Sequence, residues 1–337
     1  MKIIIPMAGM GKRMRPHTLT IPKPLIPIAG KPIVERLAED IVKITRGNVD
    51  EIAFIIGEFG EEVEKELLQI AERLGAKGSI YYQYEPQGTA HAILCAANSL
   101  KGPVTVAFAD TLFSADFELD ASKDGIIWIH RVSDPSAFGV VVTDQNNLIT
   151  NFVEKPKEFI SNQAIIGIYY FKDGENLRNE LQYLIDNDIR KGNEYQLTDA
   201  LFNMMNKGFR FSTGAVDEWL DCGNKNATVY TNQRILELHN GGENQISEDA
   251  KVDSSIIVSP CFIGPGAILN NSIVGPHVSI GAGTLVEHSI ITNSIVQSNS
   301  KLKNANIDNS MIGNYVEYNG DINELSIGDY TTISYSI

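Results

Sequence analysis

Apolar and polar residues alternate along residues 1–238 in blocks that predict strands and helices in turn. Short runs rich in Ile, Val and Phe predict buried strands, and apolar residues at helical spacing between them predict helices. The strand candidates are Ile3–Pro6, Ile52–Ile56, Ile80–Tyr84, Val104–Phe108, Ile126–His130 and Ile165–Phe171. The helix candidates are Ile33–Arg46, Glu61–Leu74, Thr89–Leu100, Glu175–Asp186 and Leu197–Asn206. This alternation predicts an α/β domain with a mostly parallel sheet that is covered on both faces.

The pattern changes after residue 238. The polar stretch "HNGGENQISEDA", residues 239–250, predicts a linker. Aliphatic-Gly pairs then recur in "IGPGAI", "VGPHVS", "IGAGTL", "IGNYVE" and "IGDYTT". Such hexapeptide repeats, led by Ile or Val, are typical of a left-handed parallel β-helix, an all-β domain expected at 251–337; a string of hairpins is the alternative. The block 252–335 would hold about four coils, with irregular coils expected in the poorly periodic segment 292–326.

Composition narrows the class of protein. The 337 residues are 43% hydrophobic and 21% charged, as in soluble globular proteins. A net charge of −14 argues against nucleic acid as a general partner, although a single basic pocket could still hold a nucleotide. No apolar run reaches membrane-spanning length and no signal peptide precedes the first strand. The three cysteines (Cys95, Cys222 and Cys261) lack metal-ligand spacing, so we expect core thiols, a cytoplasmic location and no membrane partner.

The opening stretch "MKIIIPMAGMGKRMRP" runs from an apolar strand into glycines and basic side chains. Residues 1–36 carry seven Lys or Arg against one acid, Glu35. A dinucleotide fingerprint would need glycine in place of Met14, and a P-loop would need Ser or Thr in place of Arg13. The strand-then-glycine layout still predicts backbone N–H groups that converge on a phosphate; an exposed basic loop is the alternative.

Two carboxylates follow apolar strand ends far apart in the sequence. Asp110 lies in "VAFADTLF" and Asp221 in "DEWLDCGN". Ligands of α/β sheets bind beyond the carboxyl ends of the strands, so both carboxylates could meet there. Two carboxylates at such a place are suited to a magnesium ion that also binds phosphates, although either one alone is more often a turn residue.

Three further strings carry polar groups suited to substrates. In "IPKPLIPIAGKP", prolines flank Lys23 and fix the direction of its ammonium group. In "QYEPQGTAHA", Gln83 both donates and accepts, as reading the edge of a base requires. In "FVEKP", Glu154 is an acceptor for hydroxyl groups beside Lys155, which suits a phosphate.

Taken in order, these strings resemble the sugar-1-phosphate nucleotidyltransferases, also called nucleotide-sugar pyrophosphorylases. The resemblance covers residues 1–240, and the thymidylyl- and uridylyltransferases are the members that it favours, through Gln83. It implies a Rossmann-like nucleotidyltransferase domain. The matching segments are Ala8–Met14, Pro22–Pro27, Gly88–Ala92, "FGVV" at 138–141, "VEKP" at 153–156 and "WLDCG" at 219–223. Lys12, where Thr or Ser is usual, and Ala109, where glycine is frequent, depart from the family pattern.

The resemblance implies a role for each matching position. The backbone of Ala8, Gly9 and Gly11 would hold the nucleotide, and Gln83, Gly88 and Thr89 would surround its base. Arg13 and Lys23 would be catalytic, by neutralising the triphosphate and the transition state. Asp110 and Asp221 would hold Mg²⁺. The sugar phosphate would lie at Gly139, Glu154, Lys155 and Gly167, while the role of Asp199 in "YQLTDAL" is left open.

The expected reaction joins a pyrimidine nucleoside triphosphate, dTTP or UTP, to a sugar 1-phosphate, with glucose 1-phosphate as the default by family frequency. Three alternatives stay open: a mannose-1-phosphate guanylyltransferase, an N-acetylhexosamine-1-phosphate uridylyltransferase and a catalytically silent regulatory paralogue. A fourth adds acetyl transfer by the β-helix, with His277 and His288 as bases; hydrogen-bonded surface histidines are the simpler interpretation. We expect the β-helix to build a homo-oligomer or to pack on its own catalytic domain.

Overall fold

The computed structural model describes residues 1–116, 118–239 and 245–321. Its contacts divide the chain into two compact units, Met1–Thr231 and Asn232–Ile337. The division falls inside helix α6 (Lys225–Leu238), just before the linker predicted at 239–250. Among the described residues, no helix combines the length and the apolar character needed to cross a bilayer.

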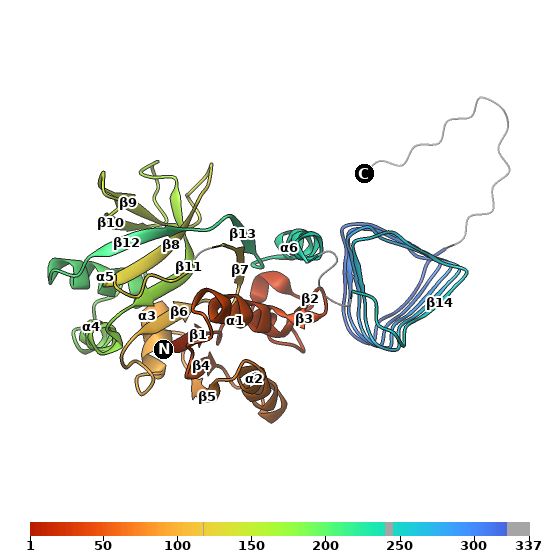
Figure 1. Ribbon diagram of the computed structural model, residues 1–337, viewed down its shortest axis with the longest axis horizontal. Coiled ribbons are helices and arrows are strands. Elements are labelled where there is room, and N and C mark those ends of the chain that lie inside the picture. The colour runs from red at the N-terminus through yellow and green to blue at the C-terminus, as the bar shows by residue number, and fades with distance from the viewer. Residues whose placement is uncertain (117, 240–244, 322–337) are drawn as a thin grey trace. The chain divides into compact units, whose positions relative to one another are not determined.

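The first unit is built on a nine-stranded sheet, which confirms the α/β prediction (Figure 1). Its path runs β10-β9-β11-β6-β1-β4-β5, and β8 pairs with both β11 and β12. Neighbours are parallel from β6 through β1 and β4 to β5, whereas β11 is antiparallel to β6, β8 and β9, so the sheet is mixed. The strands are β1 (Lys2–Pro6), β4 (Glu51–Ile56), β5 (Lys77–Tyr82), β6 (Val104–Ala107), β8 (Gly125–Arg131), β9 (Gly139–Thr143), β10 (Ile149–Glu154), β11 (Gln163–Phe171) and β12 (Phe211–Ala215).

Helices cover both faces of this sheet, because its central strands are apolar on both sides. Ile4 of β1 and Ala53 and Ile55 of β4 belong to one core cluster with residues of α3, α4 and α5. The alternating Ile3 and Ile5 are equally buried on the opposite face. The predicted helices are all present, as α1 (Ile33–Ile44), α2 (Glu61–Arg73), α3 (Thr89–Cys95), α4 (Gly174–Asp186) and α5 (Leu197–Asn206).

The second unit contains three parallel ladders, which fit the predicted left-handed β-helix, and Figure 1 shows its coils stacked with a triangular outline. The first ladder is β14 (Lys251–Asp253), β17 (Ile268–Asn270), β20 (Leu285–Glu287), β23 (Lys301–Lys303) and β26 (Glu317–Asn319). The second is β15 (Ile256–Ile257), β18 (Ile273–Val274), β21 (Ile290–Ile291) and β24 (Asn306–Ile307). The third is β16 (Cys261–Ile263), β19 (Val278–Ile280), β22 (Ile295–Val296) and β25 (Met311–Ile312). The expected last repeat, "IGDYTT", lies outside the described residues.

The corners of the coils carry polar residues throughout the stack. One corner column consists of Ser254, Asn271, His288 and Asn304, all with positive φ. Asn adopts this backbone conformation more readily than most residues, so the corners favour Asn over apolar residues. Hydrogen bonds between coils span 17 residues early in the stack and 16 later. The described part of 292–326 thus continues the ladders with a shorter coil.

Buried serines connect the coils, and one of them provides a stability test. Ser289 Oγ accepts a hydrogen bond from Ala305 N at 2.9 Å and donates one to Glu287 O at 2.7 Å. Ser289→Ala leaves the buried Ala305 N–H without this acceptor, which we expect to cost about 1–3 kcal/mol of stability. Calorimetric unfolding of the full chain measures this loss. The exposed Ser254→Ala is the matched control, and equal melting temperatures for the two variants would contradict the prediction.

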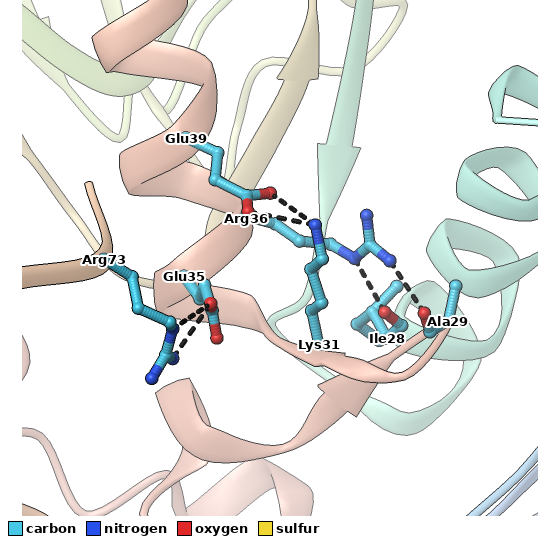
Figure 2. Close-up of polar contacts among 7 residues, drawn as sticks. All are labelled: Ile28, Ala29, Lys31, Glu35, Arg36, Glu39 and Arg73. Carbon is cyan, nitrogen blue, oxygen red and sulfur yellow. Dashed lines mark hydrogen bonds and ion pairs between the residues drawn. The ribbon is translucent and has the colours of Figure 1, made fainter. Parts of the chain in front are cut away.

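A buried arginine fixes the segment that follows Lys23. Arg36 of α1 is 3% exposed, and its guanidinium donates to Ile28 O through Nε and to Ala29 O through Nη2, both at 2.7 Å (Figure 2). These carbonyls belong to a hairpin of β2 (Pro27–Ile28) and β3 (Lys31–Pro32). Two ion pairs flank it: Lys31–Glu39 and Arg73–Glu35. Arg36 therefore holds the chain between the Lys23 turn and α1 in place.

Asp40 of α1 should make stability depend on pH. Burial raises the pKa of its carboxyl from 3.8 to about 7, against the opposing charge of Arg36. The folded state thus binds this proton more tightly than the unfolded state, and the resulting stabilisation is lost as pH rises from about 4 to 7. We expect Asp40→Asn to be more stable than wild type at pH 8, by about 1–3 kcal/mol, and to lose this advantage near pH 4. Unfolding at both pH values measures it; an advantage independent of pH would contradict the assignment.

Candidate active site

In the glycine-rich loop that follows β1, Gly11 has a backbone conformation and surroundings that only glycine fits without strain. Gly11 has φ +57°, and a Cβ there would lie 3.0 Å from Thr18 Cγ2 and 3.1 Å from Lys23 Cβ. Thr18 Oγ1 also donates to Gly11 O at 2.9 Å. The loop is thereby packed against the turn that carries Lys23, and a 3₁₀ turn, Lys12–Met14, follows it directly.

A cavity of about 300 Å³ opens beside this loop. It lies beyond the carboxyl ends of β1 and β6, where ligands of parallel sheets bind. Eight of the residues predicted from the sequence line it: Ala8, Gly9, Gly11, Lys23, Gln83, Gly88, Thr89 and Asp110. The structure therefore brings together segments from four separate parts of the first unit.

The two predicted metal carboxylates are neighbours because a second, two-stranded sheet joins their segments. In this sheet β7 (Thr111–Ser114) pairs with β13 (Glu218–Asp221), with Thr111 opposite Asp221. Cys222 N also donates to Asp110 O at 2.9 Å. The Lys23 ammonium lies 2.8 Å from Asp110 Oδ2, so a cation already faces one of the carboxylates.

Arg13 lies close to the same charged cluster of Lys23, Asp110 and Asp221. Burial, together with the nearby Asp110 charge, raises the pKa of Asp221, while the Gly223 N–H and the cations of Lys23 and Arg13 oppose this shift. A Cβ at Gly223 would lie 3.3 Å from Arg13 Nη2 and 2.9 Å from Asp221 Oδ1, which places the guanidinium close to that carboxylate. The cluster thus combines two carboxylates with two cations.

This donor set fits a magnesium ion that is also bound by substrate. No group of three or more His, Cys, Asp or Glu suited to a metal occurs within the described ranges, so Asp110 and Asp221 would supply only part of a coordination shell. Mg²⁺ is commonly held by one or two carboxylates, with waters and phosphate oxygens as the remaining ligands. Burial and, to a lesser extent, the Asp110 charge raise the pKa of Asp221, and a bound cation would oppose both effects.

A second cavity, of about 220 Å³, shares Thr89 and Phe108 with the first. Gly139, Glu154 and Gly167, which were predicted to hold a sugar phosphate, line it. At Gly139 a Cβ would lie 2.9 Å from Glu154 Oε2, so a larger residue there would collide with this carboxylate. The two cavities meet at shared residues, as a reaction between two bound substrates requires.

Lys155 and Asp199 line neither of these two cavities. The Lys155 side chain is about two-thirds exposed, with Nζ 3.9 Å from Glu154 Oε1. Burial raises the pKa of Asp199 at the start of α5. The predicted phosphate contact of Lys155 therefore stays a prediction, and Asp199 gains no assigned role.

The loop before α5 and the first two residues of that helix supply site residues that the sequence did not single out. Glu194 lines the first cavity, and Gln196, Leu197 and Thr198 line the second. Tyr195 O accepts from Ala90 N at 3.0 Å, which joins this loop to α3. The available signal was the polar string "GNEYQ" immediately before a helix, but only tertiary structure places it between two cavities.

Comparisons with known proteins agree on the family. The profile of the family described as Nucleotidyl transferase matches residues 2–237. The low-salt glycan biosynthesis nucleotidyltransferase Agl11 of Haloferax volcanii is 28% identical over 93% of this chain and 92% of its own length. A glucose-1-phosphate thymidylyltransferase of Streptomyces griseus is 26% identical, over 98% of both chains. The crystal structure of a UDP-glucose pyrophosphorylase complexed with UDP-glucose shares the fold over 70% of this chain and 98% of that one, with a TM-score of 0.58 and 24% identity.

Proposed function

Because this chain belongs to the nucleotidyl transferase family, we propose that it transfers a nucleotidyl group from dTTP or UTP to a sugar 1-phosphate, with glucose 1-phosphate as the default sugar, and releases pyrophosphate. It is a sugar-1-phosphate nucleotidyltransferase. The observation that carries the proposal is the pair of cavities that meet at Thr89 and Phe108, beside the cluster of Lys23 and Asp110.

In the proposed reaction the protein positions two anions that repel each other. The phosphate of the sugar is already an anionic nucleophile, so no strong general base is needed when it attacks the α-phosphorus and pyrophosphate leaves. The first cavity would hold the nucleoside triphosphate and the second the sugar phosphate. Holding reactants in line can lower a barrier by about 7–11 kcal/mol in favourable cases.

Charge neutralisation is the other contribution of the site. Lys23 and Arg13 would face the negative charge that spreads over the phosphates. Asp110 and Asp221 would hold Mg²⁺, which supplies further positive charge at the phosphate oxygens when it is bound. Lys23 would exchange its contact with Asp110 for the phosphate as substrate and metal enter.

Two alternative functions differ from this proposal only in the nucleotide and the sugar that react. Guanylyl transfer to mannose 1-phosphate and uridylyl transfer to an N-acetylhexosamine 1-phosphate would use the same cation and carboxylate cluster. A silent regulatory paralogue is disfavoured, since Arg13, Lys23, Asp110 and Asp221 are all present. Acetyl transfer gains no support from His277, whose Nε2 lies 2.9 Å from Glu237 Oε1 in the second unit.

The test is a matrix of Mg²⁺-dependent pyrophosphate release. It crosses UTP, dTTP, GTP, ATP and CTP with the 1-phosphates of glucose, mannose and N-acetylglucosamine. We expect turnover with a pyrimidine nucleotide and glucose 1-phosphate. Activity confined to GTP with mannose 1-phosphate would replace this assignment, and bound nucleotide without any turnover would favour the regulatory paralogue.

We further propose that the enzyme works in the cytoplasm as a homo-oligomer. The cysteines Cys95, Cys222 and Cys261 are all free, as a reducing compartment favours. The exposed apolar residues Val252, Ile256, Ile273 and Ile290 lie on the β-helix and could serve subunit contact. Light scattering after size-exclusion chromatography measures the oligomeric state, and a monomer at micromolar concentration would contradict this part of the proposal.

A further inference from the structure

The peptide bond between Asp221 and Cys222 is held by a hydrogen bond on each side. Its N–H, which belongs to Cys222, donates to Asp110 O at 2.9 Å. Its carbonyl, which belongs to Asp221, accepts from Thr231 Oγ1 at 2.8 Å. Because a peptide unit is planar, the two bonds together fix the orientation of the plane that joins Asp221 to the backbone of Asp110.

The pairing of β7 with β13 directs the Asp221 carbonyl away from β7. In an antiparallel pair of strands, hydrogen-bonded and non-hydrogen-bonded residue pairs alternate. The Cys222 N–H donates to Asp110 O, so these two residues form a hydrogen-bonded pair. The next pair, Asp221 opposite Thr111, is therefore of the other kind. The Asp221 carbonyl needs its partner from another element, and Thr231 of α6 provides it.

The same turn also holds the side chain of Asp221. Gly223 N donates to Asp221 Oδ1 at 2.9 Å, so the turn engages one of the two carboxylate oxygens. The orientation of the turn therefore decides where the other oxygen, Oδ2, can meet a metal ion. Thr231 is fully buried beneath this turn, where water cannot replace its hydroxyl group.

We propose that Thr231 is a positioning residue for the metal site: its hydroxyl group holds the peptide plane after Asp221 so that the carboxylates of Asp110 and Asp221 can bind one Mg²⁺ ion. The proposal rests on the proposed function, in which these carboxylates bind the metal together with a nucleoside triphosphate. It gives a role to a residue that lines neither cavity. Replacing a group that orients a metal ligand typically costs about 10–100-fold in metal affinity.

The test uses three variants of α6. Thr231→Val keeps the shape of the side chain and removes the hydroxyl group, whereas Thr231→Ser keeps the hydroxyl group. Thr228→Val is the matched control, because Thr228 is equally buried on the same helix and its hydroxyl group donates to Asn224 O at 2.7 Å. This carbonyl also accepts from Thr228 N, so it keeps a donor in the control variant.

Calorimetry without sugar 1-phosphate measures the binding of UTP, dTTP and GTP, once with Mg²⁺ and once with EDTA. For the nucleotide that binds most tightly, the ratio of the two dissociation constants gives the coupling between metal and nucleotide. We expect Mg²⁺ to tighten this binding by about tenfold or more in wild type. Thr231→Val should reduce the ratio to about twofold or less, with binding in EDTA nearly unchanged. Thr231→Ser and Thr228→Val should keep the wild-type ratio.

Hydrogen exchange of the ligand-free protein measures the state of the peptide plane directly. The Cys222 N–H should exchange about tenfold faster or more in Thr231→Val than in Thr228→Val, since the plane loses one of its two hydrogen bonds. Equal exchange rates in the two variants would show that Thr231 does not hold this plane.

The outcomes separate this inference from the reaction itself. If Thr231 were only structural, Thr231→Val would lower the melting temperature and weaken nucleotide binding equally with and without Mg²⁺. That result overturns the proposal, as does a wild type that binds no nucleotide or binds it independently of Mg²⁺. If Thr231→Val fails to fold, Thr231→Ala carries the comparison with Thr231→Ser. A wild type with Mg²⁺-dependent nucleotide binding but no pyrophosphate release would instead refute the proposed reaction and leave the role of Thr231 standing.

Discussion

Replacing Asp110 with Asn is expected to lower kcat/KM for pyrophosphate release by about 10²–10³-fold or more. Asp110 contacts the Lys23 ammonium and lies near Asp221, so its charge would serve both the cation and the proposed metal ion. An amide keeps the shape of the side chain but removes the negative charge that holds Mg²⁺. Steady-state assays over a range of Mg²⁺ concentration measure the effect.

The control for this variant is Asp116→Asn, which removes an exposed carboxylate six residues along the chain. It should retain activity within about twofold, as surface substitutions usually do. Asp221→Asn should resemble Asp110→Asn, and the double variant should lose less than the product of the two single losses, because both residues serve one site. Asp110→Asn with nearly full activity and an unchanged Mg²⁺ dependence would exclude the proposed metal site.

Gly88→Ala is expected to have the second largest effect, a loss of about tenfold to a hundredfold in kcat/KM that arises mainly through KM for the nucleotide. A Cβ at Gly88 would lie 2.5 Å from Tyr195 O and 2.7 Å from Tyr195 N, both backbone atoms. The residue also has φ +107°, where a side chain is strained. The loop would have to separate from residue 195 and shift Gln83 and Thr89 in the cavity.

Gly208→Ala separates backbone strain from this collision. Gly208 has φ +96°, and nothing lies within 4 Å of the position its Cβ would take. We expect it to lower the melting temperature while KM for the nucleotide stays within about twofold of wild type. If Gly88→Ala changed only the melting temperature as well, the contact between Gly88 and Tyr195 would have no part in nucleotide binding.

Much of the first unit could be predicted from its sequence because its central elements carry strong periodic patterns. Apolar runs such as Ile52–Ile56 and helical spacing such as Glu61–Leu74 matched β4 and α2 within a residue or two. The strands β9, β10 and β12 were not predicted; β9 and β10 pair antiparallel with their neighbours, whereas β12 is parallel to β8. All three are short and partly exposed, so their apolar runs are too short to mark them.

The structure of the β-helix was likewise predicted only in part. Its Ile and Val repeat predicted the parallel ladders, since the strands of each coil bury apolar residues in one common core. The shortening of the coil from 17 to 16 residues was not predicted. It depends on how many residues each corner uses, and corners are recognised by backbone angles that Ser, Asn, His and Gly all adopt.

By itself the sequence determined the kinds of groups in the site and the segments that carry them: a glycine loop, a lysine between prolines and carboxylates at strand ends. Local patterns encode these features, because backbone freedom and burial are properties of a few successive residues. Only the tertiary structure decided which groups meet. The β7–β13 pair sets Asp221 beside Asp110, the loop at Tyr195 packs against Gly88, and the amide of Gln83 meets the ring of His91. Such contacts join residues that no periodicity links, and they form only when the whole sheet and its helices have packed.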